Sequence, residues 1–72
     1  MQTVNVIEYK DDAIVSVQTF EETPEGNATA IEIFKGVIEE NFTETTDEEI
    51  AVALDEGLIE QGGYQLFLVH SI

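Results

Sequence analysis

NATAIEIFKGVIEENF, residues 27–42, is the stretch that decides the fold of this chain. On a helical wheel at ~100° per residue its apolar side chains gather on one face: Ala30, Phe34, Val37 and Ile38, with Ile31 and Phe42 at the margin. Two helix starts overlap, because Asn27 can cap the first turn and TAIE at residues 29–32 has the pattern of a capping box. The stretch predicts an amphipathic helix that needs an apolar sheet or a second helix to cover its stripe.

Two strands are expected before this helix. Residues 3–9 (TVNVIEY) and residues 13–20 (AIVSVQTF) alternate well enough for β-structure, and the polar residues 10–12 (KDD) form a turn between them. The two strands therefore form a hairpin. Residues 21–26 (EETPEG) follow as an acidic loop, in which Pro24 and Gly26 break both strand and helix patterns.

A second helix and a last strand are expected after it. Residues 43–46 form a short polar link, and Thr46 begins a second capping box, TDEE, with three acids in the first helical turn. Ile50, Ala53 and Leu54 form a narrow apolar stripe, and Gly57 fits a left-handed helix end. Gly62-Gly63 then turns the chain into residues 64–72 (YQLFLVHSI), a strand that is apolar on both faces.

This order predicts a single α+β domain over residues 1–72: β-β-α-α-β, with a three-stranded, mainly antiparallel sheet and two helices packed on one face. The strand residues expected to face the helices are Val4, Val6, Val15, Val17, Leu66 and Leu68. The far face of the sheet would then carry an apolar patch, a candidate oligomer face: Ile7, Tyr9, Ile14, Phe20, Phe67 and Val69. A β-bulge that shifts the register, or a loop that covers the patch, is the alternative.

The charge balance is the most unusual property of the chain. Acidic residues number 16 against two lysines, Lys10 and Lys35, which gives a formal net charge of -14. Direct binding to nucleic acid or to an anionic membrane depends on Lys and Arg, so both are excluded, and a basic protein is the favoured partner. Solubility alone would also explain the acids. A halophilic origin is a further explanation, although halophile surfaces tend to favour Asp and Glu outnumbers Asp here.

No catalytic, cofactor or metal-binding pattern is found in the sequence. His70 is the only histidine, and a Ser-His-acid arrangement would need Ser16 or Ser71 beside it. The acidic clusters at residues 11–12 and 47–49 lack the alternating ligand order of a calcium loop, and Cys is absent. We therefore expect no enzyme activity, no cofactor and no metal. No apolar run approaches the ~18 residues of a membrane span and no signal peptide is evident, so the expected location is the cytoplasm.

The segment from Ala28 to Ser71 resembles short acidic proteins encoded by bacteriophages and prophages. The resemblance is carried by IFKGVIEEN, by DEEIAVALDEGLIEQGGY and by the closing LVHS. That group has no agreed activity, so the resemblance implies an origin in a phage and assigns no role to any residue. The expected location becomes the cytoplasm of the host cell.

Because the acids cluster around the loop and the helices, we expect an acidic binding face made of these residues: Glu21, Glu22, Glu25, Glu32, Glu39, Glu40, Glu44, Asp47, Glu48 and Glu49. Carboxylates ~6–8 Å apart would approximate phosphate spacing, which suggests a DNA mimic that inhibits a nucleic-acid-handling protein. A homo-oligomeric module that uses the far sheet face, as a weak homodimer, is the second hypothesis. A small enzyme or metal-binding domain is the third.

Overall fold

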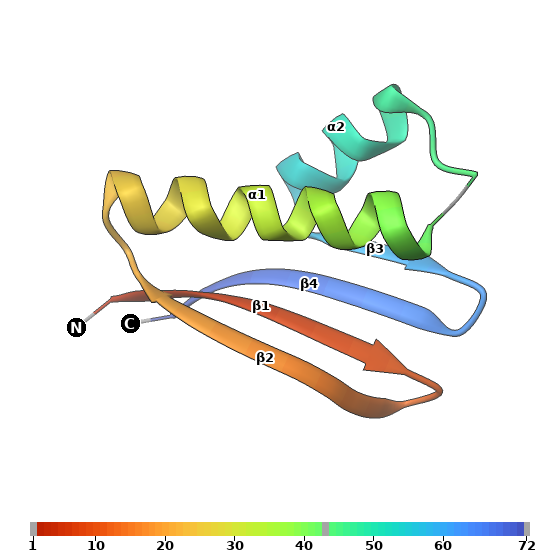
Figure 1. The fold of residues 1–72 in the computed structure, drawn as a ribbon, viewed down its shortest axis with the longest axis horizontal. Coiled ribbons are helices and arrows are strands. Elements are labelled where there is room, and N and C mark those ends of the chain that lie inside the picture. The colour runs from red at the N-terminus through yellow and green to blue at the C-terminus, as the bar shows by residue number, and fades with distance from the viewer. Residues whose placement is uncertain (1, 43, 72) are drawn as a thin grey trace.

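The structure is a computed structural model that describes residues 2–42 and 44–71. The elements in chain order are β1 (Thr3–Lys10), β2 (Ala13–Glu21), α1 (Pro24–Asn41), α2 (Asp47–Glu56), β3 (Leu58–Gln61) and β4 (Tyr64–Ser71). The strands form one antiparallel sheet in the order β2-β1-β4-β3, and both helices lie on one face of it (Figure 1). The α+β class is confirmed, but the sheet has four strands where three were expected. Met1, Thr43 and Ile72, at the edges of the expected link and last strand, lie outside the described residues.

The additional strand, β3, begins directly after α2. Gly57 ends α2 in the left-handed conformation expected for it, with φ of 72°. Its N–H donates to the Ala53 carbonyl at 2.7 Å, and its own carbonyl accepts from the Leu68 N–H at 2.8 Å. The chain thus passes from the helix into pairing with β4 without a loop. Gly62 and Gly63, both at positive φ, form the two-residue turn between β3 and β4.

Helix α1 begins three residues earlier than expected. Its N-cap is Thr23, whose hydroxyl accepts from the Gly26 N–H at 3.0 Å, and Pro24 occupies the first turn. Proline suits this position because its missing N–H would have no helical partner there. The predicted start at Asn27 or at the 29–32 capping box is therefore wrong, and the Thr29 hydroxyl instead donates to the Glu25 carbonyl at 2.9 Å. Half of the expected acidic loop, residues 24–26, is therefore helical, and Glu21 belongs to β2.

The core lies between the helices and the central strands. Its buried members are Val4, Val6, Ala30, Phe34, Ile38, Phe42, Ala53 and Leu66. The expected stripe of α1 is confirmed, except that Ile31 stays 39% exposed. On α2 the expected stripe is also confirmed: Ala53 is buried, and Ile50 and Leu54 pack against the core. No polar or charged residue is buried within residues 2–42 and 44–70.

Strand β2 carries a bulge that changes which of its residues face the helices. Glu8 pairs with Ser16 but Tyr9 pairs with Ile14, so Val15 is the extra residue. Residues directly opposite one another share a face. Phe20 lies opposite the buried Val4 and packs against the core.

The prediction that Phe20 belongs to the far face is therefore wrong. Val17 lies opposite Ile7, on the far face, and is 53% exposed, and Val15 is exposed as well. Their expected place under the helices is also wrong. The physical reason is the bulge, which adds one residue to β2 and so places Ile14 and Phe20 on opposite faces.

Candidate functional site

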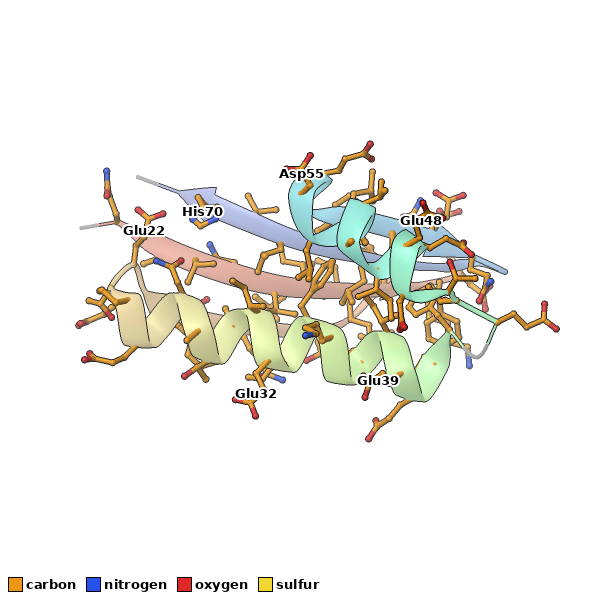
Figure 2. The ribbon with its side chains drawn as sticks, turned by 90° about the horizontal axis from the view of Figure 1, so that it is seen from above. Glu22, Glu32, Glu39, Glu48, Asp55 and His70 are labelled. Carbon is orange, nitrogen blue, oxygen red and sulfur yellow. The ribbon has the colours of Figure 1, made fainter. Side chains whose placement is uncertain are left out.

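The residues of the expected acidic face come from four parts of the chain. Glu21 ends β2, Glu22 lies in the link to α1, four glutamates lie on α1, and Glu44 and the first turn of α2 supply the rest. All of them are exposed except Glu22, which is half-buried. Figure 2 shows Glu32 and Glu39 on the side of α1 that points away from α2, whereas Glu48 projects from α2. The acids thus lie on two flanks of the helical layer.

The flank on α1 is a sparse row. Glu25, Glu32 and Glu39 are seven residues apart and so share one side of the helix, with a rise of ~10.5 Å between neighbours. Lys35 lies beside this row and lines a shallow hollow together with Glu32 and Glu39. The spacing along this row exceeds the ~6–8 Å expected for phosphate-like spacing, and Lys35 partly neutralises the charge of the row. It matches a phosphate strand only loosely.

The flank on α2 is denser in carboxylates. Asp47, Glu48 and Glu49 form the first turn of α2, where the helix dipole favours negative charge. The expected capping box is confirmed: the Glu49 N–H donates to the Thr46 hydroxyl at 3.2 Å, and Glu49 Oε1 accepts from the Thr46 N–H at 3.3 Å. Glu49 is therefore held in place, while Glu48 is free to meet a partner.

A groove that sequence reasoning missed runs between α2 and β3. Its lining includes Glu48, Glu49, Val52, Leu58, Ile59 and Glu60, around a volume of ≈ 470 Å³. This α2–β3 groove could not be expected without β3. A signal was present, because the runs LIEQ and YQLF on either side of Gly62-Gly63 have the pattern of a hairpin.

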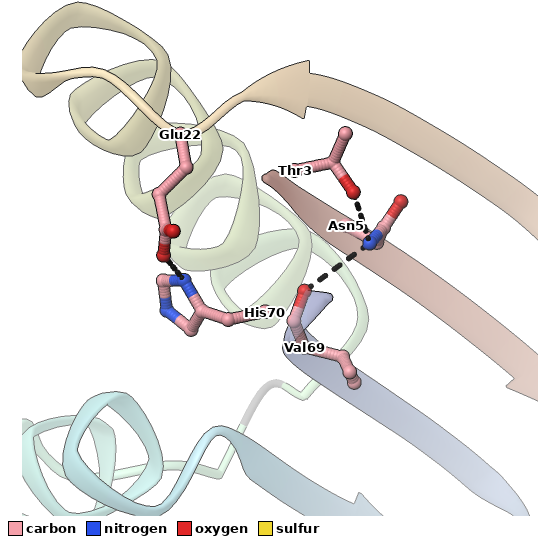
Figure 3. Close-up of polar contacts among 5 residues, drawn as sticks. All are labelled: Thr3, Asn5, Glu22, Val69 and His70. Atoms are coloured by element: carbon pink, nitrogen blue, oxygen red, sulfur yellow. Dashed lines mark hydrogen bonds and ion pairs between the residues drawn. The ribbon is translucent and has the colours of Figure 1, made fainter. Parts of the chain in front are cut away.

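Glu22 differs from the other acids because it has a partner. Its Oε1 contacts Nδ1 of His70, which lies near the end of β4 (Figure 3). This contact ties the link before α1 to the edge of β4. It is the only ion pair among the residues that the structure describes.

Two serines, Ser16 and Ser71, could complete a Ser-His-acid set; Ser16 is not beside His70, and the side chain of Ser71 lies outside the described part of the chain. His70 lies opposite Val4 of β1, whereas Ser16 lies opposite Glu8, four residues further along the same strand. At ~3.4 Å per residue this separation is far beyond hydrogen-bond reach. Within the described part of the chain, no group of three or more His, Asp or Glu side chains is placed to hold a metal ion. Neither helix in residues 2–42 and 44–71 is long and apolar enough to cross a membrane.

The far face of the sheet carries the apolar patch, with changed membership. Ile7, Tyr9, Ile14, Phe67 and Val69 lie there as expected, and Val17 and Leu58 join them in place of Phe20. Tyr9 and Phe67 contact edge to face, with ring centroids 5.5 Å apart. Asn5 of β1 links the neighbouring strands on this face. Its side-chain oxygen accepts from the Thr19 hydroxyl at 2.7 Å, and its side-chain amide donates to the Val69 carbonyl at 3.3 Å, the second of which is drawn in Figure 3.

Comparison with known proteins found no matching family model, no similar curated protein and no similar solved structure, so the resemblance to phage proteins and the acidic binding face stay predictions.

Proposed function

We propose that this protein is a non-enzymatic interaction module, encoded by a phage, that binds a basic protein through its acidic helical layer. The partner is a protein that normally handles nucleic acid in the host cytoplasm, and binding inhibits it as a DNA mimic would. The observation that carries this proposal is the charge of the helical layer. Its exposed carboxylates have no ion-pair partner among the described residues, apart from Glu22 with His70.

A surface of one sign selects a partner of the other sign. Lys35 is the only basic residue of the helices, so the layer offers a mixed-charge partner little complementarity. The summed field of a net charge of -14 would steer association with a basic cleft and make the affinity strongly salt-dependent. Basic clefts are the usual property of proteins that grip phosphate backbones.

The test is a pull-down from host lysate at low and at high salt. The variant changes Glu39, Glu40, Asp47, Glu48 and Glu49 to Gln or Asn. A control variant removes charges that lie outside the helical layer, on the β1–β2 hairpin, from Glu8, Asp11 and Asp12. We expect a nucleic-acid-handling protein to be retained by the wild type and by the control, and to be lost from the variant and at high salt. Equal retention by variant and control would mean that the acids act only as solvated surface.

The far sheet face supports a second candidate, a homo-oligomeric module. The face exposes Val17, Ile14 and Val69, and among the described residues its charged members are only Glu21 and Glu60, both on edge strands. Two copies that meet through this face would keep their acidic helices on the outside. Four strands of this length cover an area of roughly 500 Å², below the ~800 Å² per partner of a stable complex. The dimer would therefore be weak.

A further inference from the structure

The α2–β3 groove combines an apolar floor with an acidic rim. Val52 and Leu58 line it and are 52% and 41% exposed, although both are aliphatic. Glu48 and Glu49 border it on the helix side and Glu60 on the strand side. Its volume of ≈ 470 Å³ is large enough for one or two side chains of a bound peptide.

One wall of this groove is an open sheet edge. β3 pairs with β4 alone and ends the strand order β2-β1-β4-β3. The Gly57 carbonyl accepts from Leu68, so the antiparallel alternation points the backbone groups of Leu58 and Glu60 away from β4. LIEQ contains no Pro and no Lys, the residues that usually block such an edge. The edge can accept another strand.

The charges around the groove select the occupant. Glu49 is fixed by its capping contacts, and Glu60 Oε2 accepts from Gln65 Nε2 at 2.8 Å, so two carboxylates are held in place. Neither lysine lines the groove: Lys10 Nζ lies 5.4 Å from the Tyr64 ring centroid, and Lys35 lies on α1. A second copy, with a net charge of -14 and no Lys in β2 or β3, would be repelled. These charges favour a basic segment of another protein as the occupant.

We propose that the α2–β3 groove binds an extended segment of the partner, in which Lys or Arg alternates with aliphatic residues, as an added strand beside β3. Its aliphatic side chains would lie on the helix side, against Val52 and Ile59, and its cations on the opposite side, where Glu60 lies. Glu48 and Glu49 on the helix side would attract the basic segment through their field rather than by direct contact. Backbone hydrogen bonds to Leu58 and Glu60 would set its register. The inference rests on the proposed function in one respect, namely that the partner is basic.

The probe for this site is the synthetic peptide acetyl-Lys-Val-Arg-Val-Lys-Val-amide, titrated into the full ¹⁵N-labelled chain and followed by NMR. We expect saturable amide shifts concentrated at Val52 and at residues 58–61. Val52→Lys, which places a cation at the exposed floor, should weaken binding by roughly tenfold. Glu48→Gln with Glu60→Gln should weaken it by about fivefold.

Two controls separate the groove from general attraction to an acidic protein. Glu8→Gln with Asp12→Asn removes the same charge from the β1–β2 hairpin, outside the acidic binding face, and should change the affinity by less than about twofold. A peptide with the same side chains but N-methylated at alternate residues cannot pair with β3 and should lose binding. If that peptide binds equally well, or if the hairpin variant is weakened as much as the groove variant, the groove is not the site. The lysate pull-down tests the proposed partner class separately, since peptide binding does not depend on it.

Discussion

The bulge in β2 can be tested by two substitutions, because β2 with the bulge and β2 without it predict opposite effects of these substitutions on stability. Phe20 packs against the core, opposite Val4, whereas Val17 is 53% exposed on the far face. Phe→Ala costs about 3–5 kcal/mol at fully buried sites, so at the half-buried Phe20 we expect a loss of about 2 kcal/mol. Val17 buries less than half of its side chain, so Val17→Lys should lower the free energy of unfolding by under about 1 kcal/mol.

The assay is urea unfolding followed by far-UV circular dichroism, at a concentration low enough to keep the protein monomeric. With an m-value of about 1 kcal/mol/M for so small a domain, Phe20→Ala should lower the midpoint by roughly 2 M and Val17→Lys by less than about 1 M. Unchanged m-values would show that both variants unfold from the same native state. If Val17→Lys lowers the midpoint as much as Phe20→Ala does, β2 runs without the bulge and Val17 faces the helices.

Three further predictions concern stability and self-association. Gly36→Ala should raise the free energy of unfolding by about 0.5–1 kcal/mol, because a Cβ there meets nothing within 4 Å. Gly57→Ala should lower the free energy of unfolding by more than about 1 kcal/mol, because Gly57 has a positive φ and the added Cβ would lie 2.6 Å from the Leu68 carbonyl oxygen. Urea unfolding of both variants checks this. The melting temperature should rise from low salt to ~0.3 M NaCl because screening relieves the repulsion within a chain of net charge -14, and a flat or falling curve in calorimetry would contradict this. Sedimentation should detect a weak dimer at high salt, and Phe67→Glu on the far face should abolish it. The far face is not an interface if the protein is a monomer under all conditions and Phe67→Glu leaves solubility and stability unchanged.

The parts of the fold that the sequence predicted are those with long periodic patterns. The stripe of α1 repeats over about three turns, so Ala30, Phe34 and Ile38 could be placed correctly from spacing alone. The Thr46 capping box and the left-handed Gly57 were also predictable, because each depends on contacts within one turn of the chain. Local chemistry decides these features, and tertiary packing only confirms them.

The parts that the sequence did not predict depend on pairing between distant strands. β3 is only four residues long, too short for alternation to stand out, and it is stabilised by β4 rather than by its own composition. The bulge at Val15 has no Gly or Pro to mark it, and it becomes visible only when β1 fixes the register of β2. The start of α1 is not decided by the sequence pattern because Thr23, Asn27 and Thr29 are all good caps, and because Pro24, which would break a helix interior, suits a first turn.

The missed strand changes which part of the acidic surface could discriminate among partners. On α1 the row of Glu25, Glu32 and Glu39 has a rise of ~10.5 Å between neighbours and lies beside Lys35, an arrangement that attracts cations without fixing their position. On α2 the carboxylates flank exposed aliphatic side chains and an open strand edge, so charge, apolar contact and backbone pairing act at one place. Charge mainly governs the rate of encounter and is weakened by salt. Apolar contact depends on the partner's sequence, and both apolar contact and backbone pairing slow dissociation. Selectivity for one basic protein among many would therefore come from the α2–β3 groove, and the α1 row would contribute mainly to long-range attraction.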